Sequence, residues 1–401
     1  MCTCQKPMVY IRNPQDPMYN RVATGGVPNC AVSCKSPYFT KDQIMFSEMW
    51  IKCWSIVCFV VTLMTVSTFL IDMRRFKYPE RPIIFLSTCY MFVSIGFLIR
   101  IVAGHEAVAC AHRTDHVLYH TTGPVLCTTV FLLVYFFSMA SALWWVILAM
   151  TWFLAAGLKW GSEAIEKYSQ YYHAAAWLIP SLKSIMVLAM SSVDGDSLSG
   201  ICFVGNQDVR ALRGFVLAPL VVYLLLGGMF LLAGFISLFR IRNRIKKGGT
   251  KTDNLEKLMG RIGIFSVLYM VPAAALVACY FYEQKYRPMW EYSHNCRSMF
   301  KTPEDANVPQ LSFVAAHNKY SFEGPIFPEF IVFMVRYLMT LLIGITNGVW
   351  ICSPKTLTSW KGFYRRCVCC LNGAPCPPPC GKDIFTAKTS VVAIREIKKG
   401  T

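Results

Sequence analysis

The sequence predicts an all-α membrane protein: a bundle of seven transmembrane helices followed by a short cytoplasmic helix. Three observations support this fold class. Of the 401 residues, 55% are hydrophobic and only 15% are charged, whereas soluble domains are about 25% charged. Seven apolar stretches approach the roughly 20 residues that a helix needs to cross a bilayer. Basic residues are concentrated in alternate connecting segments.

The seven stretches are expected to be helical because lipid offers the backbone no hydrogen-bond partner. They make residues 49–351 one bundle, preceded by an extracellular linker at 1–48 and followed by a cytoplasmic helix and a basic, cysteine-rich tail at 352–401. The predicted spans are 49–71, 83–103, 125–154, 171–191, 214–239, 260–282 and 327–351. The halves show no repeat, which disfavours transporter folds that are built on repeats.

Lysine and arginine counts set the orientation. With the N-terminus outside, the inner segments hold 23 of these residues and the outer segments hold 13. Segments with excess positive charge stay on the cytoplasmic side, so the C-terminus is expected inside. The net charge of +18 is therefore interpreted as membrane-orienting charge and not as a nucleic-acid surface.

Four basic residues lie within the predicted spans, where charge is expensive and often functional. Lys52 and Arg100 are close enough to the outer ends to extend their charged groups toward water. Lys183 and Arg336 lie deeper and are expected to face the bundle interior. Aspartate and glutamate are nearly missing from the spans, which disfavours a proton or cation pathway.

No enzyme chemistry is indicated. The chain contains no phosphate-binding loop, no Gly-x-Ser-x-Gly nucleophile motif and no His-Glu-x-x-His metal motif. We therefore expect neither catalysis nor a cofactor. Four histidines crowd the first outer loop, and solvated side chains are favoured over a metal site there. They are His105, His112, His116 and His120.

The inner tail carries a run of cysteines at Cys367, Cys369 and Cys370. Cysteines that follow basic residues close to a membrane are candidates for palmitoylation. An unmodified reduced tail is the alternative, and a metal site that also uses Cys376 and Cys380 is the weakest, because the spacing is unlike that of zinc sites.

Several long motifs closely resemble those of the Frizzled family, the class F seven-transmembrane receptors. The resemblance runs from about residue 17 to residue 365, and the context around 17–22 and 27–34 is most similar to the five/eight subgroup. The matching strings are DMRRFKYPERPIIFLS (72–87), WWVIL (144–148), TWFLAAG (151–157), VDGD (193–196), LRGFV (212–216), LFRIR (238–242), GTKT (249–252) and KTLTSW (355–360).

The resemblance implies a Wnt receptor of the plasma membrane that passes its signal to the cytoplasmic adaptor dishevelled. A heterotrimeric G protein and a membrane lipid or sterol are further implied partners.

Only about 48 residues precede the first span, so the cysteine-rich ligand-binding domain of the family is expected to be missing. Wnt binding is expected only when that domain is present. The alternatives are a G-protein-coupling receptor of another class, a transporter or channel, and a non-signalling decoy.

Position and resemblance together imply disulfides on the outer side, where oxidising conditions let them persist. Cys127, at the start of the third span, is expected to pair with Cys202 in the loop before the fifth. Cys34 with Cys110 is a second expected pair. Cys4 is expected to pair with Cys30, although Cys2 competes for the same partner, and Cys296 is left over.

The resemblance also implies two functional sites on the inner side. Arg261 and Trp350 form an activation switch. Lys355 and Trp360 lie about 140° apart on a helix, so Trp360 can anchor in the membrane interface while Lys355 faces the cytoplasm. Pro354 suits the first turn of that helix. The predicted dishevelled-docking residues are Lys355, Thr356, Trp360, Arg74, Arg75, Lys77, Lys246, Lys247, Lys251 and Thr252.

Overall fold

The computed structural model describes residues 2–73, 78–111, 115–120, 124–247, 253–296, 326–351 and 354–371, and within these helices it leaves undescribed the side chains of 244–247, 253–267, 354–355 and 366–371. The chain forms two compact units. Unit 1 comprises Met1–Val66 and Lys77–Val349, and unit 2 comprises Ser67–Phe76 and Trp350–Thr401.

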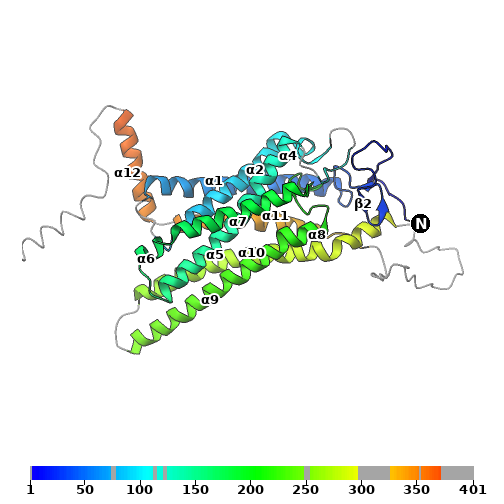
Figure 1. Cartoon of the computed structure of the whole chain (residues 1–401). Helices are drawn as coiled ribbons and strands as arrows, with labels where there is room; N and C mark the ends of the chain where they lie inside the picture. Colours follow the sequence, from blue (N-terminus) through cyan, green and yellow to red (C-terminus); the bar gives the residue numbers. More distant parts are fainter. Residues whose placement is uncertain are drawn as a thin grey trace, which may run out of the picture. The chain divides into compact units, whose positions relative to one another are not determined.

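Unit 1 is built from long helices that run lengthwise beside one another (Figure 1). Short helices α3 (His105–Ala109) and α6 (Ser162–Glu166) lie in the connections. Two of the long helices contain a wider π-helical turn, η2 and η3. The long elements are α1 (Lys41–Ile71), α2 (Pro82–Ala103), α4–η2–α5 (Val125–Phe131, Leu132–Phe136, Phe137–Ala156), α7 (Ser169–Ala189), α8–η3–α9 (Val209–Ala211, Leu212–Leu217, Ala218–Lys247), α10 (Asp253–Asn295) and α11–η5 (Phe330–Thr346, Asn347–Ile351).

Five of these elements are long and apolar enough to cross a membrane among the described residues: Lys41–Ile71, Pro82–Ala103, Val125–Ala156, Val209–Asn243 and Phe330–Ile351. The fourth and sixth predicted spans fall on α7 and α10. Helix α7 begins with polar residues and contains Lys183, which lowers its mean hydropathy, and the first part of α10 has no described side chains. The prediction of seven spans is therefore borne out for five.

Several helices extend beyond the predicted spans. Helix α1 begins at Lys41 instead of residue 49, α9 ends at Lys247 instead of residue 239, and α10 runs from Asp253 to Asn295 instead of from 260 to 282. The end of α10 is held outside the apolar stretch by contacts with the N-terminal segment, because the backbone N–H of Thr3 donates to the Asn295 carbonyl over 3.1 Å. Sequence hydropathy cannot show such a contact.

The expectation of purely helical structure also needs correction. Three short antiparallel strand pairs occur: β1 (Val9–Tyr10) with β4 (Cys30–Ala31), β2 (Ala23–Thr24) with β3 (Val27–Pro28), and β5 (Val193–Gly195) with β6 (Cys202–Val204). Gly25 and Gly26 join β2 to β3 with φ of 59° and 79°, the left-handed values that tight hairpins require. The N-terminal segment is thus a folded module and not a plain linker.

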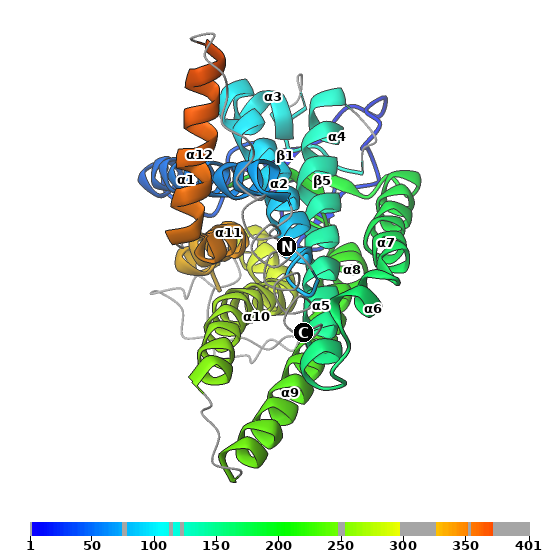
Figure 2. The same cartoon turned by 90° about the vertical axis from the view of Figure 1, so that its left-hand side faces the viewer.

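Helix α5 is the centre of the packing, with α2 and α9 as its main neighbours. Figure 2 shows α7 at the edge of this group of helices. The ring of Trp145 on α5 stacks on Tyr269 of α10 with centroids 4.4 Å apart. The same ring also lies against Gly227 on α9, where an added Cβ would be 2.0 Å from the indole. A glycine at this position therefore allows α9 to approach α5.

Gly227→Ala should destabilise unit 1 by about 1–3 kcal/mol, the usual cost of overpacking a core, because the Trp145 ring has to move. Thermal unfolding of the purified chain in detergent measures the effect. The matched control is Gly228→Ala, where the nearest atom to an added Cβ is the flexible end of Met270 at 3.4 Å. Equal melting temperatures for the two variants would contradict this account of α5–α9 packing.

Candidate functional site

A buried ionic cluster lies at the end of unit 1 that carries the strands. Arg336 on α11 is 7% exposed. Its guanidinium donates to a Glu283 carboxylate oxygen on α10 over 2.5 Å and to Asp196 Oδ2 over 3.1 Å. The hydroxyl of Tyr337 donates to the same Asp196 oxygen over 2.9 Å. Arg336 thus joins the β5–β6 connection, α10 and α11.

A second arginine balances the charge of the cluster. Arg287 is one helical turn from Glu283 on α10 and is paired with it. It also donates to the carbonyl oxygen of Gly205 over 2.7 Å. The cluster therefore contains two guanidinium groups and two carboxylates, and it adds no net charge to a buried region.

Asp196 is held in its ionised form. Burial acts to raise the pKa of this carboxyl, but the charge of Arg336 and hydrogen bonds from Ser199, the Leu198 N–H and Tyr337 hold the pKa below its ordinary value. The Ser199 hydroxyl donates to Asp196 over 2.6 Å and the Leu198 N–H donates over 2.9 Å. Asp196 is therefore an anion at every physiological pH.

The remaining residues of the VDGD motif fix the β5–β6 hairpin. Asp194 is fully buried and accepts the backbone N–H groups of His120 and Gln207 over 3.0 and 3.2 Å. Gly195 lies against the loop before the third span, because an added Cβ would be 2.2 Å from the Ala109 carbonyl oxygen. The sequence indicated only a family resemblance for this motif, and the structure shows the contacts of Asp194, Gly195 and Asp196.

Sequence reasoning missed the partners of Arg336. It expected the side chain to face the interior, and the burial agrees. Glu283 falls one residue past the predicted end of the sixth span and Asp196 lies in a loop, so a search for carboxylates within spans excluded both. The signal that could have found them is the deep arginine, since a buried charge requires an opposite charge close by.

A cavity of about 90 Å³ lies next to the cluster. Asp196 and Arg336 contribute its charged groups, while apolar and aromatic side chains make up most of the remaining wall, among them Tyr90, Trp145 and Tyr269. A cavity of this size has room for several water molecules. The π-helical turns η2 and η3 both reach its wall, through Val134 and Val216.

Four disulfides tie the same end of unit 1 together. Cys127–Cys202 joins α4 to β6, Cys34–Cys110 joins the N-terminal segment to the connection after α3, and Cys4–Cys30 lies within the N-terminal segment. These three are the pairs expected from the sequence. The fourth, Cys2–Cys296, joins the N-terminal segment to the residue that follows α10 and resolves the competition between Cys2 and Cys4.

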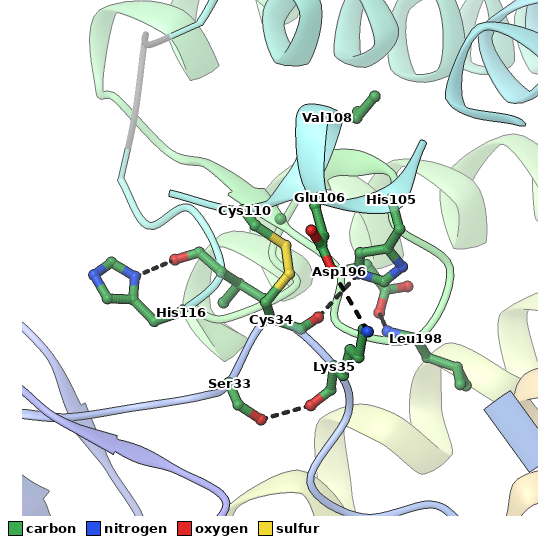
Figure 3. Close-up of a disulfide and its surroundings, with 12 residues drawn as sticks. Ser33, Cys34, Lys35, His105, Glu106, Val108, Cys110, His116, Asp196 and Leu198 are labelled. Carbon is green, nitrogen blue, oxygen red and sulfur yellow. Dashed lines mark hydrogen bonds and ion pairs between the residues drawn. A yellow bond between two sulfur atoms is a disulfide. The ribbon is translucent and has the colours of Figure 1, made fainter. Parts of the chain in front are cut away.

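The surroundings of Cys34–Cys110 correct the expectation of solvated histidines for His105 and His116 (Figure 3), whereas His120 is exposed as expected and His112 lies outside the described residues. His105 Nε2 is 2.9 Å from the Cys34 carbonyl oxygen and its Nδ1 is 3.2 Å from an Arg100 nitrogen. This arrangement fits a neutral ring, since burial and the positive charge of Arg100 lower the pKa of His105. His116 is also buried, at 3% exposure.

Arg100 does not extend toward water as expected. It is 4% exposed and is paired with Glu48 of α1 over 3.4 Å. Gly200 makes room for it, because an added Cβ there would be 2.7 Å from Arg100 Nε. Lys52, in contrast, is exposed on α1.

Unit 2 brings the end of α1 against α12 (Pro354–Leu371). The indole N–H of Trp360 donates to the Thr68 hydroxyl over 2.9 Å, and the Ser359 hydroxyl donates to Asp72 over 3.0 Å. Trp360 thus has a protein partner for its N–H, and its place in the membrane interface stays a prediction. The helix begins at Pro354, as the proline predicted.

Most other predicted inner residues lie outside the described parts of the structure. Arg74, Arg75, Lys77, Lys251 and Thr252 have no described position. Lys246 and Lys247 are on α9, Arg261 on α10, and Lys355, Cys367, Cys369 and Cys370 on α12, all without described side chains. Thr356 is half-buried on α12, and Trp350 is half-buried on η5.

Comparison with known proteins decides the family. Residues 38–367 match the Frizzled/Smoothened family membrane region. The chain belongs to this family. It is 62% identical to Frizzled-5 of Xenopus laevis over 375 residues, which is 94% of this chain and 63% of that protein. It is 61% identical to Frizzled-8 of Xenopus laevis over 370 residues, 91% of this chain and 60% of that protein.

A human relative gives the same result. Human Frizzled-5 is 58% identical over 369 residues, which cover 92% of this chain and 60% of that protein. The resemblance to the five/eight subgroup, predicted from short motifs, is therefore confirmed. The chain spans about three fifths of the length of these Frizzled relatives.

Arg336→Met should destabilise this Frizzled-family chain by about 3–5 kcal/mol, because it leaves Glu283 and Asp196 as buried charges without their partner. The melting temperature in detergent measures the loss. Lys52→Met is the matched control, since Lys52 is exposed and its removal should change stability by at most about 0.5 kcal/mol. If both variants unfold at the wild-type temperature, the cluster does not hold α10 to α11.

Proposed function

We propose that this Frizzled-family chain is the membrane region of a Wnt-pathway receptor in the plasma membrane, and that it recruits dishevelled on its cytoplasmic side. The docking surface is formed by the start of the first inner loop, the third inner loop and the Lys355-Thr-Leu-Thr-Ser-Trp360 segment. Receptor function, and not catalysis, is what the family implies.

The observation that carries this proposal is the pair of hydrogen bonds from α12 to the end of α1. Trp360 binds Thr68 and Ser359 binds Asp72. The basic segment with Arg74 and Arg75 follows Asp72 directly in the chain. One of the three proposed docking segments, Lys355–Trp360, is thus hydrogen-bonded to the residues that directly precede another in the chain, although almost 300 residues separate them.

Two independent features support an extracellular N-terminus. The four disulfides all gather at the end of unit 1 that carries the N-terminal module, and disulfides persist on the oxidising side of a membrane. The connections at the opposite ends of the helices carry most of the basic residues, as cytoplasmic loops do. The distribution of basic residues and the positions of the disulfides therefore both support an extracellular N-terminus and a cytoplasmic C-terminus.

Trp360→Ala and Lys355→Ala should each abolish dishevelled recruitment while surface expression is retained. Removing Trp360 also removes the bond to Thr68, so Thr68→Val should weaken recruitment in the same direction, by a smaller amount. Recruitment of fluorescent dishevelled to the membrane of cells that express each variant measures the effect.

Tyr364→Ala is the matched control for these variants, because Tyr364 is an aromatic residue on the same helix with 71% exposure. It should recruit dishevelled normally. Normal recruitment by both Trp360→Ala and Lys355→Ala would place docking elsewhere. Loss of surface expression in Trp360→Ala would instead assign the helix a structural role.

Arg261 and Trp350 are proposed as the activation switch on the basis of the family resemblance. A guanidinium over an indole contributes about 0.5–2 kcal/mol, which is sufficient to shift a two-state receptor several-fold. Trp350→Leu should therefore raise basal signalling in a cell reporter assay at equal surface expression. Basal output at the wild-type level would count against the switch.

A further inference from the structure

Lys183 is a charged residue within the fourth predicted span that neither the ionic cluster nor the docking surface uses. It lies on α7, at the edge of the helices of unit 1 (Figure 2). Its ammonium is 3.0 Å from the hydroxyl of Tyr223 on α9 and 5.1 Å from the centre of that ring. These contacts hold the ammonium at the junction of α7 and α9.

The surroundings of Lys183 differ from those of the other deep charges in the described part of the chain. Arg100 is paired with Glu48, and Arg336 with Glu283 and Asp196. Among the side chains that the structure describes, no aspartate or glutamate is paired with Lys183. A cation at membrane depth without a counter-charge is unfavourable, so an anion from outside the chain would stabilise it.

The surface next to Lys183 is apolar on both helices. Helix α7 runs toward the β5–β6 hairpin and α9 leads away from it, so Ile179 and Leu226 both lie about one turn farther from the hairpin than the Lys183–Tyr223 pair. Their side chains are 40% and 41% exposed. The Lys183–Tyr223 contact therefore lies nearer the hairpin, and the exposed apolar side chains of Ile179 and Leu226 lie farther from it.

We propose that Lys183 and Tyr223 bind the phosphate of a phospholipid from the membrane leaflet nearest the hairpin, with an acyl chain lying along Ile179 and Leu226. The Lys183 ammonium donates one N–H to the Tyr223 oxygen and has two more for phosphate oxygens. Tyr223 is only 8% exposed, so Lys183 is the main phosphate contact and the Tyr223 hydroxyl holds the ammonium in place. Charge complementarity selects a phospholipid over a sterol, because a sterol hydroxyl is neutral.

This lipid site lies in unit 1 and does not depend on dishevelled docking, so it extends beyond the proposed function. Its test uses the full-length chain, purified in maltoside micelles, with a phosphatidylcholine probe that carries a photoactivatable group in its acyl chain. Mass spectrometry of digested protein then measures labelling of the peptides from α7 and α9. Unlabelled phosphatidylcholine should compete with the probe.

Lys183→Met should reduce labelling of α7 and α9 about fivefold, since one lysine beside lipid phosphate contributes about that factor. Lys183→Arg keeps the charge and should retain labelling. Tyr223→Phe should give an intermediate value, because the ammonium remains. The matched control is Lys52→Met, which removes an exposed span lysine on α1 and should leave labelling of α7 and α9 unchanged.

A diacylglycerol probe with the same photoactive chain lacks the phosphate and should label α7 and α9 only at background. Equal labelling by the two probes, or wild-type labelling of Lys183→Met, would overturn the proposal. Stronger labelling by a photoactive fatty acid would also overturn it, because the anion would then be a carboxylate. If Lys183→Met fails to fold, the comparison of the phospholipid and diacylglycerol probes on the wild-type chain decides the question.

Discussion

The ion pairs of the buried Arg336 guanidinium are the interaction on which the hairpin end of the bundle depends. A charge at this depth is stable only when carboxylates surround it, and the fold supplies Glu283 from α10 and Asp196 from the β5–β6 hairpin. Asp196 can reach Arg336 only if the hairpin folds over the helices. The Cys127–Cys202 disulfide fixes the same hairpin to α4, so covalent and ionic constraints act on one element.

These constraints make α10 one of the elements that connect the N-terminal module to the bundle, beside the Cys34–Cys110 disulfide. Glu283 and Arg287 lie in the ionic cluster, while Asn295 donates to the Thr24 carbonyl over 2.8 Å and Cys296 is bonded to Cys2. One continuous helix, Asp253–Asn295, therefore extends from the N-terminal module to the side of the bundle that carries Arg261.

The two units of the chain are stabilised by different chemistry. The hairpin end of unit 1 is held by four disulfides and buried ion pairs. In unit 2 the contacts between α12 and the end of α1 include the hydrogen bonds Trp360–Thr68 and Ser359–Asp72. A typical hydrogen bond contributes only about 0.5–1.5 kcal/mol. Each of these two bonds is thus individually weaker than a disulfide of unit 1, which contributes about 2–4 kcal/mol.

The sequence by itself determined the membrane class, the approximate spans, the family and three of the disulfide pairs, because hydropathy, charge asymmetry and motif identity are properties of short segments. Tertiary structure alone decided which carboxylates neutralise Arg336 and that Arg100 is buried with Glu48. It also decided that Cys2 bonds Cys296 and that Trp360 binds Thr68. In each of these cases the partners are far apart in the chain and one of them looks unremarkable in its own segment. Glu283 appears to be a loop residue until α10 is seen to continue past the apolar stretch, since the contacts that extend the helix come from residues at the other end of the chain.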